Sequence, residues 1–208
     1  MKNSQITHWC HEIIKSQAPK GGFYIDATMG KGNDTAFFCE LAGEEGKVLA
    51  FDVQVKAIEA TAALLIQKGL ADRATLIMDG HEKMKKYADS ETADVICFNF
   101  GYLPGGDHNI STKADTSIPA IEQGLEVLKS GGMMSLCIYS GGDTGFEEKD
   151  AILEYLKKLS PKEYVVIKNE YFNSRPICRW WGGALAAWVR GRRGRSGRRQ
   201  HPSVCRGS

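Results

Sequence analysis

The segment DATMGKGNDT at residues 26–35 has the clearest chemical pattern in the chain. Gly30 and Gly32 allow the backbone to turn tightly and to approach a ligand closely. A helix that starts directly after this turn would present free backbone N–H groups to the same ligand. Asp52 ends the next apolar run, at a spacing where a carboxylate can accept hydrogen bonds from the hydroxyls of a ribose. The pattern predicts a site for a nucleotide-type ligand.

Two cofactors fit a nucleotide site of this layout. A dinucleotide site ordinarily has a third glycine where this chain has Thr35, and it tends to avoid an acid before the turn, where Asp26 stands. S-adenosylmethionine carries an ammonium group, a sulfonium and a ribose diol, so Asp26 and Asp52 suit it better. We therefore expect S-adenosylmethionine. An NAD-dependent oxidoreductase and a tight turn that binds no ligand are the alternatives.

Asp79 and His81 follow the third apolar run. In an open α/β sheet the carboxyl ends of the strands line the ligand crevice, so we assign Asp79 to the adenine amino group. An ordinary helix N-cap is the alternative for this residue. His81 is a second candidate for the same pocket, although a single histidine more often packs or caps than takes part in catalysis.

The segment NFGYLP at residues 99–104 resembles the Asn/Asp-Pro-Pro-Tyr turn of enzymes that methylate amino groups. In that turn the Asn side chain and a backbone carbonyl accept hydrogen bonds from the target amine, and the aromatic ring packs on the substrate base. Asn99 and Tyr102 are therefore candidate catalytic residues, with plain packing as the alternative for Tyr102. His108 or Asp107 could accept a proton or belong to a solvated turn, and His108 is the candidate that we retain.

Strand-like and helix-like segments alternate along the chain. We expect strands at residues 23–26, 48–53, 74–78, 94–98, 133–139 and 164–167, and helices at 34–41, 56–68, 119–129 and 147–158. This alternation predicts an α/β fold, a mostly parallel, doubly wound, Rossmann-like sheet with helices on both faces. The six cysteines lack the close spacing of a zinc site, so we expect reduced thiols, no metal and a cytoplasmic protein.

Charge divides the chain at about residue 175. Residues 1–174 carry 18 basic and 25 acidic side chains, a net charge of −7, whereas residues 175–208 carry nine arginines and no acid. We expect a catalytic domain at 1–175 and a mobile, arginine-rich tail at 176–208, in which residues 184–189 could pair as a substitute last strand. No apolar run approaches the roughly 20 residues of a membrane span.

The arginine tail raises a third possible function, a non-catalytic RNA-binding protein. Arginines interspersed with glycine can contact phosphates without reading sequence. A tail with no selected role is the interpretation that we prefer, because lysine gives way to arginine abruptly near residues 173–176. Such a change indicates a shifted reading frame or a fused end.

At these motifs the chain resembles a bacterial family of small class I methyltransferases that carry the label rRNA methylases. The shared signatures are DATMGKGNDT, AFDVQ, DGHE, NFGYLPGGDH and TKADTSIPAIEQGLEVLKSGG, and the similarity runs from about residue 7 to 173. The resemblance implies methylation of the aminomethyl group of 5-aminomethyl-2-thiouridine at the tRNA wobble position. Ribosomal or other nucleic acid is the alternative substrate. The implied partner is the anticodon region of tRNA, and a homodimer is possible.

The resemblance also implies which residues form the cofactor pocket and its rim. Thr28 lies in the same glycine turn and joins this set on its position alone. The candidates are Asp26, Thr28, Gly30, Gly32, Asn33, Asp34, Thr35, Asp52, Gln54, Asp79, His81, Asn99, Gly101 and Tyr102. Members of the family usually finish with a proline-bearing turn and a last apolar strand, a pattern from which this chain departs.

Overall fold

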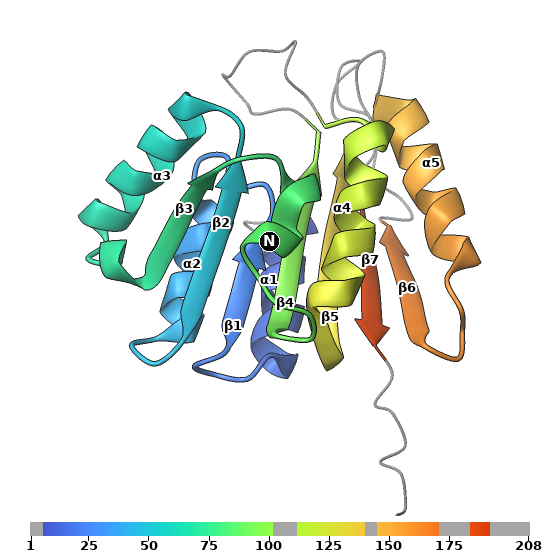
Figure 1. The fold of residues 1–208 in the computed structure, drawn as a ribbon, viewed down its shortest axis with the longest axis horizontal. Helices are drawn as coiled ribbons and strands as arrows, with labels where there is room; N and C mark the ends of the chain where they lie inside the picture. Colours follow the sequence, from blue (N-terminus) through green and yellow to red (C-terminus); the bar gives the residue numbers. More distant parts are fainter. Residues whose placement is uncertain (1–5, 102–111, 140–144, 171–183, 192–208) are drawn as a thin grey trace, which may run out of the picture.

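A mostly parallel sheet of seven strands runs through the middle of the protein (Figure 1). The computed structural model describes residues 6–101, 112–139, 145–170 and 184–191. Within these ranges the strand order is β3-β2-β1-β4-β5-β7-β6. The strands are β1 (Phe23–Asp26), β2 (Lys47–Asp52), β3 (Ala74–Met78), β4 (Ala93–Phe100), β5 (Leu128–Tyr139), β6 (Tyr164–Glu170) and β7 (Ala184–Gly191).

Strands β1 to β5 pair in parallel, and β7 runs antiparallel to both of its neighbours. In the middle of the sheet, Ile25 of β1 stands opposite Leu49 of β2 and Ile96 of β4. The chain direction across the sheet reverses at β1, because β2 and β3 lie on one side of it and β4 and β5 on the other. Ligands of open α/β sheets bind at the carboxyl ends of the strands that flank such a switch point. The predicted Rossmann-like fold is confirmed, and β1 and β4 are the strands that position its site.

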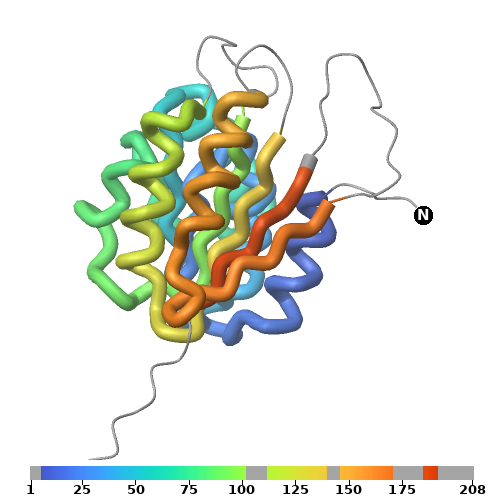
Figure 2. The backbone as a smooth tube through the Cα atoms, turned by 90° about the vertical axis from the view of Figure 1, so that its right-hand side faces the viewer, coloured from blue at the N-terminus to red at the C-terminus, as the bar shows by residue number. Residues whose placement is uncertain are grey.

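Helices cover both faces of this sheet, and Figure 2 shows α1 on one side with α4 and α5 on the other. One face carries α1 (Ile6–Gln17), α2 (Asn33–Ala42) and α3 (Val55–Gln67), and the short η1 (Ala71–Arg73) leads from α3 into β3. The opposite face carries η2 (His81–Lys86), α4 (Ala114–Val127) and α5 (Gly145–Lys158). The helix expected at 119–129 spans 114–127 in the structure. It ends at Val127 because Leu128 and Lys129 already belong to β5. No helix in the described ranges is long and apolar enough to cross a membrane.

Helix α1 has no counterpart among the elements expected from the sequence. Its buried side chains Ile6, Cys10 and Ile14 recur at every fourth residue and so share one face. They belong to the same apolar cluster as Phe38 of α2 and Val95 of β4. This packing fixes α1 on the sheet beside α2, so the polar residues of the helix hold defined positions.

The segment expected as a substitute last strand forms β7, inserted between β5 and β6. Its residues 185–189 are buried. Beyond them, Arg190 donates hydrogen bonds to the carbonyl of Gly131 (3.3 Å) and to Oε1 of Gln17 (2.8 Å). These contacts join β7 to the start of β5 and the end of α1. The division of the chain near residue 175 stays a prediction.

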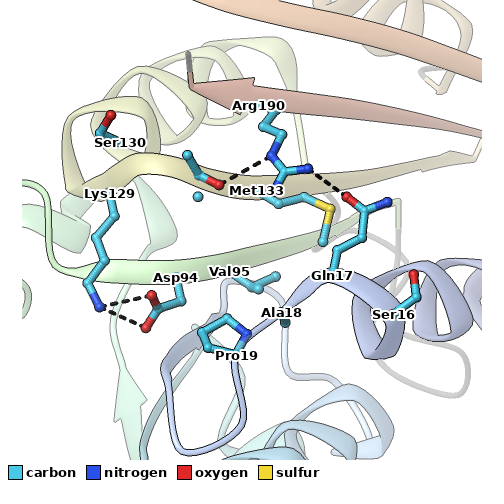
Figure 3. A pocket seen from close by; sticks show the side chains of 12 residues that line it. Ser16, Gln17, Ala18, Pro19, Asp94, Val95, Lys129, Ser130, Met133 and Arg190 are labelled. Carbon is cyan, nitrogen blue, oxygen red and sulfur yellow. Dashed lines mark hydrogen bonds and ion pairs between the residues drawn. The ribbon is translucent and has the colours of Figure 1, made fainter. Parts of the chain in front are cut away.

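Arg190 lies at a pocket of about 340 Å³, drawn in Figure 3. The pocket is lined by the first residues of β4 and β5, so it opens at the edge of the sheet opposite the glycine turn. Its other cation, Lys129, is already paired with Asp94 at 2.9 Å. We interpret this pocket as the joint between α1 and β7, and none of the predicted site residues lines it.

Trp188 tests how much the sheet depends on β7. Its side chain is 5% exposed and belongs to the cluster that holds α1 on the sheet. Trp188→Ala leaves a cavity in this cluster, so we expect the free energy of unfolding to fall by about 3–5 kcal/mol in urea titrations. Trp9→Ala removes a ring that is 53% exposed and should change that energy by less than about 0.5 kcal/mol. Equal, small effects of both variants would show that the fold does not need β7.

Candidate functional site

The glycine turn follows β1 and opens helix α2. Gly30 and Gly32 have φ angles of 51° and 80°, in the left-handed region that disfavours side chains. A Cβ on Gly32 would also lie 2.8 Å from Oγ1 of Thr61 on α3, so this position has no room for another residue. The turn is therefore a rigid backbone loop that points from the carboxyl end of β1 into the start of a helix.

Asp52, at the end of β2, holds this turn in place. Its Oδ2 accepts a hydrogen bond from the Gly30 N–H (3.1 Å), and its Oδ1 accepts one from the Gln54 N–H (2.9 Å). An ionised carboxylate has about four acceptor sites, so each oxygen can still accept a further bond. Asp52 is half-buried at the rim, where it can meet a diol.

Asp26 lies beneath the turn, with no exposed surface. It accepts hydrogen bonds from the Thr35 hydroxyl (2.6 Å) and the Thr28 N–H (3.2 Å). Burial, and next the carboxylate of Asp34, raise the pKa of Asp26 to about 7. From this position Asp26 shapes the turn and places a carboxyl group below it, and its direct contact with a cofactor stays a prediction.

A second network joins β4 to α2 and α1. The backbone N–H of Asn99 donates to Oγ1 of Thr28 (2.7 Å), which places the end of β4 against the glycine turn. The Asn99 side chain donates from Nδ2 to Oδ2 of Asp34 (2.7 Å), and Oδ1 of Asp34 lies 2.7 Å from Nε2 of His11. Oδ1 of Asn99 is buried and has no hydrogen-bond partner in the described part of the chain. Such an atom is the natural acceptor for a donor on a bound molecule.

The protonation of this network follows from its contacts. Burial alone would raise the pKa of Asp34, but the hydrogen bonds from His11 and Asn99 outweigh it and hold that pKa below the usual range. Asp34 is therefore the ionised partner of the buried carboxyl pair, and Asp26 is the one that holds a proton more readily.

The residues at the end of β3 lie further along the same edge of the sheet. Asp79 accepts hydrogen bonds from Lys83 Nζ (2.5 Å), the Gly80 N–H (2.8 Å) and the Tyr87 hydroxyl (3.0 Å). The Lys83 contact is the main reason why its pKa falls to about 2. Gly80, and not Asp79, occupies the N-cap position of η2. The adenine assignment of Asp79 stays a prediction.

His81 is buried behind the turn. Its Nδ1 lies 3.1 Å from the carbonyl oxygen of Ala27, and its ring meets Phe98 and Phe100 edge to face. Burial lowers the pKa of His81, so the neutral ring donates from Nδ1 to this carbonyl. His81 thus supports the residues after β1, and its place in the cofactor pocket stays a prediction.

Gly101 directly follows β4 and is tied to Thr112, which lies just before α4. Its N–H donates to Oγ1 of Thr112 (2.7 Å), and the Thr112 hydroxyl also contacts Oε2 of Glu148 (3.0 Å). Ser117 donates to the other oxygen of Glu148 (2.6 Å), and burial raises the pKa of this carboxyl group. Glu148 lies outside every motif of the sequence, and Thr112 is the first residue of a shared signature that assigned it no role. The predicted residues Tyr102, Asp107 and His108 lie outside the described ranges.

The structure thus brings most of the predicted residues to the carboxyl ends of four adjacent strands, β3, β2, β1 and β4. Thr28, Asp34, Thr35 and Asn99 form one connected network with Asp26, whereas Asp79 and His81 stand apart from it. His11 belongs to the network but was not predicted. Within the described ranges no group of His, Cys, Asp and Glu is arranged to hold a metal.

The fold and this site define a Rossmann-like methyltransferase. The sequence profile of a family described as "Putative rRNA methylase" matches residues 48–180, and the chain belongs to this family. A chloroplastic tRNA (mnm(5)s(2)U34)-methyltransferase of Arabidopsis thaliana is 33% identical over 182 residues, which cover 83% of this chain. The chain spans 66% of the length of that plant protein.

Solved structures agree with this assignment. A protein described as a putative rRNA-methylase from Clostridium thermocellum is 40% identical, with a TM-score of 0.85 over 92% of this chain and 100% of its own. A putative methyltransferase from Streptococcus mutans, solved in complex with SAH, is 32% identical, with a TM-score of 0.79 over 91% and 99% of the two chains. S-adenosylmethionine is the cofactor of this class.

The residues of this chain fit that cofactor. The left-handed glycine turn leaves backbone unshielded by side chains, Asp52 keeps acceptor sites for a ribose, and Asp26 and Asp34 place negative charge below the turn. Oδ1 of Asn99, which no described residue pairs, adds an acceptor beside them. This set complements a ligand with a diol and positive charge better than it complements the pyrophosphate of NAD.

Proposed function

We propose that this protein is an S-adenosylmethionine-dependent RNA methyltransferase that methylates the aminomethyl nitrogen of 5-aminomethyl-2-thiouridine at the tRNA wobble position. The observation that carries the proposal is the buried Oδ1 of Asn99 next to the glycine turn, which has no hydrogen-bond partner among the residues that the structure describes. Because this oxygen can only accept hydrogen bonds, it is suited to bind an N–H of the substrate amine and so to position that amine. The printed name of the plant relative, a methyltransferase for mnm(5)s(2)U34, supports the same substrate class.

The mechanism assigns positioning to the chain. S-adenosylmethionine, when bound, supplies an activated methyl group on a sulfonium with a good leaving group. Oδ1 of Asn99 accepts one N–H of the neutral amine and so directs the nitrogen lone pair away from the amide, toward the cofactor side of the turn. Holding two reactants in such an orientation provides much of the rate in a displacement of this kind. The turn and Asp52 hold the donor, and no residue with a proton to exchange is needed for the attack itself.

Methyl transfer to defined RNAs tests the substrate. The enzyme is incubated with S-adenosylmethionine bearing a labelled methyl group and with tRNA that contains the aminomethyl uridine, the same tRNA without that group, or ribosomal RNA. We expect label only in the first tRNA. Label in ribosomal RNA alone would replace the proposed substrate, and binding of NAD in place of S-adenosylmethionine by calorimetry would replace the class of reaction.

Binding of tRNA needs a local basic surface, because residues 1–174 carry a net charge of −7. Lys83 and Lys85 are already paired, Lys83 with Asp79 and Lys85 with Glu126. Lys31 is exposed within the glycine turn and has no ion pair inside the described ranges. We therefore infer that Lys31 contacts an RNA phosphate near the site.

Lys31→Ala should weaken tRNA binding by about threefold to tenfold and lower the salt dependence of binding by about one ion. The affinity for S-adenosylmethionine should not change. Lys162→Ala is the matched control, because this exposed lysine lies at the amino end of β6, on the opposite edge of the sheet. Fluorescence anisotropy at several salt concentrations measures both variants. Identical losses in the two would show that only overall charge matters.

A further inference from the structure

We propose that His11 is a positioning residue for methyl transfer, which acts through Asp34 to fix the orientation of the Asn99 side-chain amide. The inference rests on the proposed function, because it explains how Asn99 presents its oxygen to an amine. It adds a residue of helix α1 to a site that the motifs confine to the ends of the strands.

The argument starts from the two ends of an amide. The oxygen and nitrogen of an Asn side chain have nearly the same shape, so only hydrogen bonds decide which of them faces a ligand. Asp34 is the deciding partner here, because its ionised carboxylate can only accept and lies 2.7 Å from the Asn99 side chain. The NH2 group must therefore face Asp34, and Oδ1 must face away from it. A rotated amide would point N–H groups at the N–H groups of a substrate amine.

Asp34 can perform this role only while its own position is fixed. His11 Nε2 lies 2.7 Å from the second oxygen of Asp34, and since that oxygen accepts, the histidine nitrogen carries the proton. The His11 ring stacks on Phe37 of α2, with centroids 3.9 Å apart and planes 7° apart. Each member of the chain His11, Asp34 and Asn99 therefore has one defined orientation.

The surroundings of this chain leave Asp34 few other partners. The Cys97 thiol donates to Oδ2 of Asp34 at 3.5 Å, which is a weak contact. Burial raises the pKa of the Tyr139 hydroxyl, and the contact with Cys10 together with burial raises the pKa of the Cys137 thiol, so both groups are neutral at ordinary pH. The Cys10 thiol is occupied by Cys137, 3.5 Å away, and Asp26 is the neighbouring acid. His11 is consequently the strongest donor to Asp34 apart from Asn99 itself.

A purely structural role for His11 explains less of the geometry. Helix α1 is already anchored by Ile6, Cys10 and Ile14, each of which is at most 5% exposed. The chain of hydrogen bonds that begins at His11 ends on an oxygen without a partner in the described ranges, at the end of β4. A network built only for stability would end on a paired atom, since an unpaired buried acceptor is unfavourable.

Two substitutions separate the hydrogen bond from the packing. His11→Phe keeps a ring on Phe37 but removes the N–H, whereas His11→Gln keeps an N–H at a similar reach. We expect His11→Phe to lower kcat for tRNA methylation about tenfold to a hundredfold, the scale of losing one hydrogen bond to a charged group. The KM for tRNA and the calorimetric Kd for S-adenosylmethionine should stay near their wild-type values, whereas Tm should fall by a few degrees because buried Asp34 loses a donor. His11→Gln should recover most of kcat, and Glu12→Gln on the exposed side of α1 is the control.

A readout without substrate keeps the test independent of the proposed function. The side-chain amide of Asn99 gives a pair of signals in ¹H–¹⁵N NMR spectra, which Asn99→Ala assigns by their loss. We expect His11→Phe to shift this pair and His11→Gln to restore it. Wild-type kcat in His11→Phe, an unmoved Asn99 amide, or a loss of Tm and cofactor binding in step with kcat would each overturn the role of His11. If the wild-type enzyme does not methylate this tRNA but the Asn99 amide signals still shift in His11→Phe, the proposed substrate is wrong and the role of His11 in orienting Asn99 is retained.

Discussion

Asn99→Ala is expected to lower the rate constant for methyl transfer about a hundredfold or more, while the Kd for S-adenosylmethionine stays within about twofold. The reason is geometric, because the variant removes the acceptor that orients the amine and leaves the glycine turn and Asp52 in place. Binding and chemistry should therefore separate. Single-turnover kinetics with saturating tRNA measures the first quantity, and isothermal titration calorimetry measures the second.

A matched variant controls for the loss of an amide. Asn169→Ala, in β6 near the far edge of the sheet, removes the same group at a distance from the site. It should turn over at the wild-type rate. Full activity of Asn99→Ala would remove Asn99 from the mechanism, and equal losses in both variants would trace the effect to stability.

The second large effect concerns Asp26 and the pH dependence of stability. Its pKa is raised from 3.8 to about 7, so between these values the folded protein holds a proton that the unfolded chain has released. The free energy of unfolding therefore falls as the pH rises through this window and is flat above it, with a slope from this group of at most about 1.4 kcal/mol per pH unit. Asp26→Asn cannot ionise and should lose this part of the slope.

Urea unfolding at several pH values measures this effect. The stability of Asp26→Asn relative to the wild type should improve steadily from pH 5 to pH 7. Glu148 is buried and its pKa is also raised, so a residual slope of the same sign should remain in the variant. Asp72→Asn alters an exposed acid and should keep the wild-type pH profile. Parallel profiles for Asp26→Asn and the wild type would contradict the burial of an ionisable carboxyl group under the turn.

Asp26→Asn should weaken cofactor binding as the pH rises, although the same change improves its stability relative to the wild type. An ionised Asp26 adds negative charge below a ligand that carries an ammonium and a sulfonium, and Asn does not. At pH 8 we expect Asp26→Asn to bind S-adenosylmethionine about tenfold more weakly than the wild type, with a smaller difference at pH 6, where Asp26 is largely protonated. Calorimetry at the two pH values checks this ratio, and a ratio independent of pH would remove the charge of Asp26 from cofactor binding.

The sequence predicts the parts of this protein that depend on local patterns. Alternating strands and helices, the turn around Gly30 and Gly32, and Asp52 at the end of the next strand are all visible in short stretches of residues. The switch point between β1 and β4 follows from the fold class. Even the arginine-rich end contains a strand where its one apolar stretch, residues 184–189, allows it.

What the sequence misses depends on tertiary packing. His11 meets Asp34 only because buried residues of α1 place this helix against α2, and no motif joins the two residues. The complete burial of Asp26 under the turn, with Thr28 and Thr35 bonded to its two oxygens, also depends on tertiary packing that the motif does not report. Thr112 and Glu148 meet across 36 residues of sequence, which no local pattern reports.

Nucleoside mass spectrometry tests the central claim most directly. The enzyme is incubated with S-adenosylmethionine and tRNA that contains 5-aminomethyl-2-thiouridine, and the tRNA is then digested to nucleosides. We predict that this nucleoside is consumed and that its 5-methylaminomethyl form appears in equal amount, and that both changes are about a hundredfold slower when Asn99→Ala replaces the wild type. A methylated product on any other nucleoside, with the aminomethyl uridine unchanged, would contradict the account.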